Sequence, residues 1–193
     1  MSAKRDDIIA TTCDLLETQG YHATGLNQII KESQAPKGSL YYYFPEGKEA
    51  LAAAAIARSA DQIAANIGQA LAGGGDPAAA VTGFIRALAG YVAASGYQQG
   101  GPITAVALEA ASTHDRLRVA CRDAYRAWQE LFAAALGDAF GQQSAGRLAA
   151  LIVAAIEGGI ILARVEQSEQ PLLDVADGVE QLLGSYSKDV GGQ

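Results

Sequence analysis

The stretch that decides the fold reads LNQIIKESQAPKGSL and spans residues 26–40. Leu26, Ile29 and Ile30 have the spacing of a short helix, and after a short break a second helix begins. Pro36 falls at the first turn of that second helix, where its fixed φ angle is favourable. Two short helices joined by a tight turn predict a helix-turn-helix, whose second helix enters the major groove of DNA with its N-terminal residues toward the bases.

Helical spacing of apolar residues continues on both sides of this motif, and no segment alternates with the period of two that a half-buried strand needs. Gly20 stands where a left-handed residue would end the first helix. The segments expected to be helical are 4–19, 26–33, 37–44, 48–71, 78–94, 103–111, 115–136, 144–166 and 172–186. The sequence therefore predicts an all-α fold of about nine helices.

These helices fall into three parts along the chain. Residues 1–47 would form a helix-turn-helix DNA-binding domain that is too small to bury much by itself. It would lean on a connecting helix over residues 48–71. Residues 72–193 would form a larger helical body for ligand binding and dimerisation.

Composition limits the class of protein. The chain has 193 residues, half of them apolar and 18% charged, which excludes intrinsic disorder. No apolar run reaches the length of about 18 residues that a membrane span needs, and the N-terminus lacks the apolar core of a signal peptide. The two cysteines, Cys13 and Cys121, lie in apolar stripes, which predicts buried thiols in a reducing cytoplasm.

A set of residues at fixed spacing extends over residues 20–51. It comprises Gly20, Tyr21, Thr24, Leu26, Ile29, Ile30, Ala35, Lys37, Gly38, Leu40, Tyr41, Tyr42, Phe44, Lys48, Glu49, Ala50 and Leu51. This set resembles the DNA-binding domain of the TetR family of bacterial repressors. A weaker match in residues 101–103, 108–110 and 120–122, together with Trp128, is similar to the branch of lincomycin-resistance and flavonoid-responsive regulators. The resemblance implies a cytoplasmic homodimer that binds an inverted repeat in double-stranded DNA and is released by a small effector.

The candidate DNA contacts gather around the second helix of the motif. They are Thr24, Gly25, Pro36, Lys37, Gly38, Ser39, Tyr41, Tyr42, Tyr43 and Lys48. Three positions depart from the family pattern: Tyr43 replaces a histidine, Gln34 the glycine of the turn, and Gly25 a serine or threonine cap. The net charge of −7 does not favour nucleic-acid binding, but four of the five cations in residues 1–50 lie where the family meets DNA. We therefore expect a small basic footprint on an acidic body.

The resemblance also places a ligand cavity in the helical body. The candidate lining residues are Phe84, Leu88, Tyr91, Trp128 and Phe132, which predict an apolar or aromatic effector unless they are plain core. Small residues of the eighth helix and an apolar stripe of the ninth are the candidate dimer contacts. They are Ala155, Gly158, Gly159, Val175, Val179 and Leu182. We expect the stripe on the ninth helix to be exposed on a single chain, although both sets could instead pack within it.

No catalytic or metal-binding pattern emerges from the sequence. His22 and His114 lie far apart and have no carboxylate or cysteine partner at metal spacing. Residues 73–75 are glycines without the lysine and hydroxyl residue of a phosphate-binding loop. We therefore expect no enzymatic activity, no metal and no cofactor. The alternatives are a DNA-binding regulator without an effector and, from another class, a helical enzyme that uses the body cavity.

Overall fold

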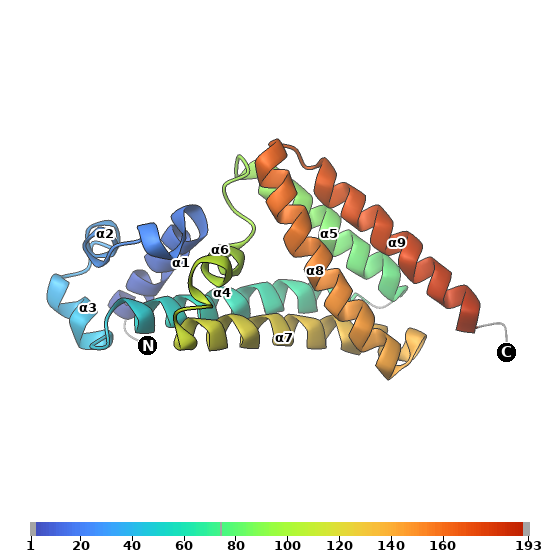
Figure 1. Cartoon of the computed structure of the whole chain (residues 1–193), viewed down its shortest axis with the longest axis horizontal. Coiled ribbons are helices and arrows are strands. Elements are labelled where there is room, and N and C mark those ends of the chain that lie inside the picture. Colours follow the sequence, from blue (N-terminus) through green and yellow to red (C-terminus); the bar gives the residue numbers. More distant parts are fainter. Residues whose placement is uncertain (1–2, 74, 191–193) are drawn as a thin grey trace. The chain divides into compact units, whose positions relative to one another are not determined.

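The computed structural model describes residues 3–73 and 75–190, and over these residues the chain forms nine α-helices and no strand (Figure 1). The helices are α1 (Ala3–Ala23), α2 (Leu26–Glu32), α3 (Lys37–Tyr43), α4 (Lys48–Leu71), α5 (Pro77–Ala94), α6 (Pro102–Ala110), α7 (Asp115–Phe140), α8 (Gln142–Glu166) and α9 (Gln170–Val190). The predicted all-α fold is confirmed for this part of the chain. The predicted helix ends differ from the observed ones by at most four residues, and the largest differences lie at the ends of α1, α7 and α9.

The helices pack into two compact units. The first, here the N-terminal unit, comprises Met1–Gln62 and Gly101–Ala124. The second, the C-terminal unit, comprises Ile63–Gly100 and Tyr125–Gln193. The boundaries fall inside α4, between α5 and α6, and inside α7. Helix α6 and the start of α7 therefore belong to the unit of the helix-turn-helix, although the sequence groups them with the body.

Helix α1 is the centre of the N-terminal unit, because α2, α3 and α6 all pack against it. Ile8 of α1, Ile29 of α2, Leu40 of α3 and Leu51 of α4 are buried in this core. Near its end α1 kinks at Gly20, which has φ 78° and ψ −178°. Glycine reaches this region without a steric penalty. Gly20 has a positive φ, but the expectation that it ends the helix in the left-handed conformation is wrong, because it kinks α1 and the helix continues to Ala23.

Local signals set the ends of α5 in the C-terminal unit. The Asp76 side chain accepts the Ala78 N–H at 3.1 Å and so caps the start of the helix, with a proline at its first position. At the other end, the Gly96 N–H donates to the Ala93 carbonyl and the Tyr97 N–H to the Val92 carbonyl, each at 3.0 Å. This pair of bonds is a Schellman motif, which ends the helix on a left-handed glycine.

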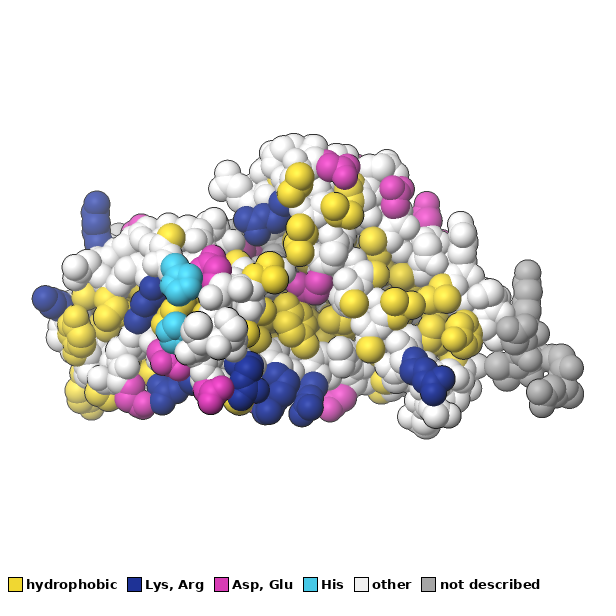
Figure 2. Space-filling model, in the orientation of Figure 1, with side chains coloured by type: hydrophobic (Ala, Val, Ile, Leu, Met, Phe, Trp, Pro, Cys, Tyr) yellow, Lys and Arg dark blue, Asp and Glu magenta, His cyan; other side chains and the backbone are white. Residues whose placement is uncertain are grey.

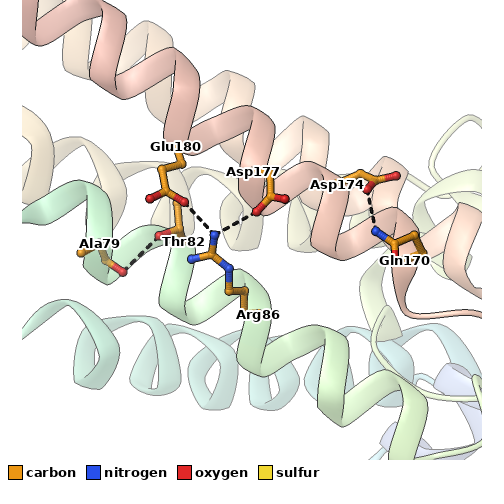
Figure 3. A network of polar contacts seen from close by, with 7 residues as sticks. All are labelled: Ala79, Thr82, Arg86, Gln170, Asp174, Asp177 and Glu180. Atoms are coloured by element: carbon orange, nitrogen blue, oxygen red, sulfur yellow. Dashed lines mark hydrogen bonds and ion pairs between the residues drawn. The ribbon is translucent and has the colours of Figure 1, made fainter.

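Helix α5 is fixed to α9 by apolar packing and by one arginine (Figure 3). The Arg86 guanidinium donates to Asp177 at 2.9 Å and to Glu180 at 2.7 Å, both on α9. Its two carboxylate partners raise the pKa of Arg86 above the ordinary value. All three side chains are exposed, so the contact specifies the register of the two helices more than it stabilises them.

Helix α9 also packs against α8, and Gly159 lies at their closest approach. A Cβ at Gly159 would lie 2.8 Å from Leu172 Cδ2 and 3.1 Å from Val175 Cγ2. Val179 is only 5% exposed, and Val175 and Leu182 are half-buried. The expectation that these three side chains form an exposed stripe on one chain is therefore wrong, because Val179 is buried and the other two are partly buried within the chain.

Two helices pass a length and hydropathy test for membrane spans, Pro77–Ala94 and Gln142–Glu166. Sequence reading expected none, because polar residues interrupt both. Their buried faces pack against α9 within the C-terminal unit, as core helices do. Length and apolar composition are thus explained by packing, and they are weak evidence for a membrane.

Candidate nucleic-acid interface

The turn between α2 and α3 is tight and left-handed. Gln34 has φ 53°, and its N–H donates to the Lys31 carbonyl at 3.4 Å. The Ser33 hydroxyl accepts the Ala35 N–H at 3.4 Å, and the Ala35 side chain is buried. Gln34 therefore adopts the left-handed conformation that the family's glycine favours at this position.

The first turn of α3 faces outward on one side and inward on the other. Pro36 occupies the N-cap with φ −56°, and its carbonyl accepts the Ser39 N–H at 2.8 Å. Lys37 and Gly38 are exposed, whereas Leu40 is fully buried against the core. This division leaves a cation and a bare backbone at the end of the helix that a major groove would receive.

The aromatic run that follows divides in the same way. Tyr42 is 79% exposed and Tyr41 is 44% exposed, while Phe44 is buried. The Tyr43 ring is half-buried and meets the Tyr42 ring edge to face at 5.1 Å between centroids. The Arg5 guanidinium lies 5.5 Å from the centroid of the Phe44 ring, which places the N-terminal arm beside the end of α3. Two tyrosine hydroxyls are therefore available to phosphate oxygens.

Thr24 and Gly25, at the start of α2, differ from one another. Thr24 is 1% exposed, and its hydroxyl donates to the Gly20 carbonyl at 2.7 Å. It therefore supports the kink from inside and does not present its hydroxyl at the surface. Gly25 is the exposed N-cap of α2 and provides no side-chain cap.

Lys48, the remaining candidate contact, is partly engaged within the N-terminal unit. Its Nζ lies 4.3 Å from the centroid of the Tyr21 ring and 3.5 Å from the His22 carbonyl oxygen. Burial lowers the pKa of Lys48, and the nearby Glu109 carboxylate opposes that shift. The cation thus packs on an aromatic face, a contact of about 0.5–1 kcal/mol at exposed sites.

The structure adds residues that sequence reasoning missed. Glu109 of α6 accepts the His22 N–H at 2.8 Å, and the rings of His22 and His114 lie 6.4 Å apart. Arg116 at the start of α7 forms an ion pair with Glu46, in the turn before α4. The cluster could not be recognised from the sequence, because His22 and Glu109 lie 87 positions apart.

The candidate effector residues all lie in the C-terminal unit, with unequal burial. Phe132 and Trp128 are buried, Phe84 and Leu88 are half-buried, and Tyr91 is 51% exposed. The rings of Phe84 and Phe132 meet edge to face, with centroids 6.0 Å apart. The Tyr91 hydroxyl lies outside this group and donates to Gln99 Oε1 at 2.9 Å.

A polar pair accompanies the same aromatic residues. The Tyr125 ring packs edge to face against Trp128, with centroids 5.3 Å apart. The Tyr125 hydroxyl donates to Glu157 Oε2 of α8 at 3.1 Å. A phenol and a carboxylate thus stand beside the tryptophan, and neither was among the candidates from the sequence.

Of the candidate dimer contacts, Ala155 and Gly158 of α8 are half-buried, while Gly159 is buried under α9. The exposed apolar side chains of α8 were not predicted. They are Leu151, Ile161, Leu162 and Val165. They recur at the spacing of one helix face, together with Ala155 and Gly158. Exposed apolar surface in the C-terminal unit is therefore concentrated on α8 rather than on α9.

Two protein families match this chain. The profile of the bacterial regulatory proteins of the tetR family matches residues 8–55, and that of the LmrA/YxaF-like C-terminal domain of transcriptional regulators matches residues 77–178. The HTH-type transcriptional regulator YxaF of Bacillus subtilis is 38% identical over 180 residues, which cover 93% of this chain and 94% of YxaF. The HTH-type transcriptional regulator LmrA of the same organism is 37% identical over 93% of this chain and 96% of LmrA.

Solved structures share the fold over nearly the whole chain. A regulatory protein TetR from Rhodobacter sphaeroides superposes with a TM-score of 0.84 at 24% identity, over 93% of this chain and 98% of that one. Reduced NemR from Escherichia coli has a TM-score of 0.80 at 21% identity, over 92% of this chain and 96% of its own.

Proposed function

The chain belongs to the TetR family of bacterial regulatory proteins and is a DNA-binding transcriptional regulator, and from this premise we propose that it is a homodimeric repressor released from its operator by a small, largely apolar effector. Regulators of this family bind DNA operators and act as dimers. The operator would be an inverted repeat, because a two-fold dimer presents its two recognition helices to two equivalent half-sites.

The observation that carries the DNA-binding part is the exposed first turn of α3. Lys37 and Gly38 face outward while Leu40 anchors the helix in the core, and Tyr42 extends beside them. A buried anchor fixes the orientation of the exposed residues, which base recognition requires. The experiment is selection of a duplex from random sequence by the full-length protein, followed by a titration at several salt concentrations. An enriched inverted repeat supports the proposal, and no enrichment contradicts it.

The dimer would form through α8. Leu151, Ile161, Leu162 and Val165 are exposed on a single chain, and soluble monomers seldom expose a continuous apolar surface of this kind. Gly158 and Ala155 on the same helix allow a partner helix to approach closely. A protein that sediments as a monomer at micromolar concentration would contradict this part.

The effector would bind among the aromatic residues of the C-terminal unit. Phe84, Leu88, Phe132 and Trp128 offer apolar contacts, and the Tyr125–Glu157 pair offers polar ones. Such a mixture suits a flat, largely apolar molecule with few hydroxyl groups. The aromatic and apolar character of these residues supports this choice of effector class. The single tryptophan allows a direct fluorescence assay with a planar flavonoid as the probe.

The two alternatives make different predictions. A regulator without an effector would show no saturable response of Trp128 to any planar aromatic probe. An enzyme would need a cluster of catalytic groups and would turn over a substrate without DNA. The curated relatives are transcriptional regulators, so we favour a non-enzymatic protein that acts in the cytoplasm.

A further inference from the structure

Glu157 is a single carboxylate in an otherwise apolar stretch of α8. It is the only charged residue between Arg147 and Arg164, and hydrophobic side chains gather along α8 on the face that Figure 2 shows. Val153 and Ile160, one turn before and one turn after it, are both buried. Residues at this spacing share one side of a helix, and the Glu157 side chain is accordingly half-buried. A carboxylate in such surroundings needs hydrogen-bond donors, because burial without them is costly.

One donor comes from α7 and places the carboxylate beside the aromatic residues. The Tyr125 hydroxyl donates to Glu157 Oε2 at 3.1 Å, and the Tyr125 ring packs on Trp128 with centroids 5.3 Å apart. Trp128 and Phe132 are one turn apart on α7, and the Phe132 ring meets that of Phe84. All five residues belong to the C-terminal unit. The carboxylate therefore lies at the polar edge of the site proposed for the effector.

The C-terminal unit has an excess of negative charge, and α8 places no cation close to Glu157. Arg147 and Arg164 are ten and seven residues away on α8, which corresponds to about 15 Å and 10 Å along the helix axis. The unit as a whole carries five Lys and Arg residues against ten Asp and Glu residues. Acidic surroundings repel an anionic ligand, so they disfavour an effector that carries a carboxylate.

An ionised carboxylate accepts hydrogen bonds and donates none, so it selects a neighbouring ligand by its donors. A hydroxyl group placed at Glu157 gains a charge-assisted hydrogen bond. An ether oxygen or a carboxylate in the same place would leave two acceptors facing each other, and such a mismatch is strongly rejected where water is partly excluded.

We propose that Glu157 determines the specificity of the effector site, and that the effector is a planar aromatic molecule whose edge presents a hydrogen-bond donor, such as a phenolic hydroxyl group, to this carboxylate. The inference rests on the proposed function, since it assumes an effector at the aromatic residues of the C-terminal unit. It adds which chemical group the effector must carry and which residue recognises that group. Both can be measured without DNA.

The experiment is a titration of the full-length protein with three matched probes, followed by the fluorescence of its single tryptophan. The first probe is the hydroxyflavone isomer that the wild type binds most tightly. The others are its methyl ether and the flavone with a carboxylate at the same position. The wild type is expected to bind the hydroxyflavone about tenfold or more tightly than the methyl ether, as a hydrogen bond to a charged acceptor would give. It is expected to bind the carboxylate more weakly still.

The variants separate the acceptor from the charge. Glu157→Met keeps the length of the side chain and removes the acceptor, so the preference for the hydroxyflavone over the ether should fall to within about threefold. Glu157→Gln keeps an acceptor without the charge, so it should bind the carboxylate more tightly than the wild type does. The matched control is Glu130→Met, an exposed position on α7 in the same unit, which should behave as the wild type. A merely structural role of Glu157 would change the affinities for all three probes together and leave their ratios unchanged.

Two outcomes overturn the inference: a wild type that binds the hydroxyflavone and its methyl ether equally, or a Glu157→Met protein that keeps the full preference. If the methionine variant does not fold, Glu157→Gln decides through the carboxylate probe, and an unchanged rejection of that probe also overturns the inference. A wild type in which none of the probes quenches Trp128 saturably contradicts the proposed effector site itself, which separates that failure from this one.

Discussion

Gln34 holds the turn between α2 and α3 in a left-handed conformation that a side chain disfavours. Its own side chain is exposed, so no burial offsets the strain. The surrounding residues fix it there, because Ile29 and Leu40 on either side are buried in the same core. Single positions of this kind decide how accurately Lys37 and Gly38 are presented to a groove.

Gln34→Gly is expected to stabilise the protein. Relief of the left-handed strain contributes about 1–2 kcal/mol, and the greater freedom of glycine in the unfolded chain removes roughly half of it. The net gain of about 0.5–1 kcal/mol corresponds to a rise in Tm of about 1–4 °C. Thermal unfolding at a fixed protein concentration measures this. Gln34→Ala, which keeps the strain, is the control, and an equal rise in both variants would contradict the explanation.

Lys37→Ala is expected to weaken binding to the selected duplex by about 1–3 kcal/mol if the ammonium group reads a guanine edge. The loss should differ between duplex sequences, because a base contact discriminates and a phosphate contact does not. Fluorescence anisotropy at matched salt measures both variants. Arg147→Ala, an exposed cation on α8, serves as the control. Unchanged affinity of the Lys37 variant would show that α3 is not the recognition helix.

Helices α8 and α9 have different roles because of how their faces are turned. Helix α9 buries Leu172, Ala176, Val179 and Leu183 within the chain. Helix α8 buries one face in the same way but leaves a second apolar face exposed, which includes Leu162 and Val165. An exposed apolar face on a helix that already has a packed side is best explained by a second copy of the chain.

Leu162→Glu is expected to dissociate the dimer without unfolding the monomer. Leu162 is 51% exposed in one chain, so glutamate is tolerated there, whereas two carboxylates in a dimer interface would be desolvated near each other. Sedimentation velocity measures the change. Ala87→Glu, an exposed position on α5, should remain dimeric. A Leu162→Glu protein that stays dimeric would show that the dimer interface does not lie on this face of α8.

The chain divides into two units whose boundaries fall inside α4, between α5 and α6, and inside α7. The unit that carries the recognition helix also holds α6, and the aromatic effector candidates belong to the other unit. Three segments of continuous backbone thus join the site for DNA to the proposed site for the effector. The proposed release by an effector requires ligand binding in one unit to shift an equilibrium in the other.

A planar flavonoid is expected to quench the fluorescence of Trp128 saturably and to weaken the selected duplex by about 5- to 150-fold. The duplex must weaken flavonoid binding by the same factor, which a reciprocal titration measures. Phe132→Ala, at a buried position of the same aromatic group, should reduce the quenching. Saturable quenching with unchanged duplex affinity would show that the flavonoid binds the protein without releasing it from DNA.

The helices could be predicted from the amino-acid sequence, because helix formation depends on local spacing, caps and breakers. Asp76 caps α5, Gly20 takes a positive φ, and the order of short and long helices matches the periodicity. The exposure of Lys37 and the burial of Leu40 also followed from their places on α3.

Which helix faces meet one another could not be predicted and is known from the packing of the helices. Val179 is buried inside the chain, Thr24 supports a kink, and Glu109 reaches His22 across 87 residues. A helical pattern states that one face is apolar, but it does not say whether that face meets the same chain or another. Contacts between distant segments depend on the angles at which helices cross, and the local sequence pattern does not specify those angles.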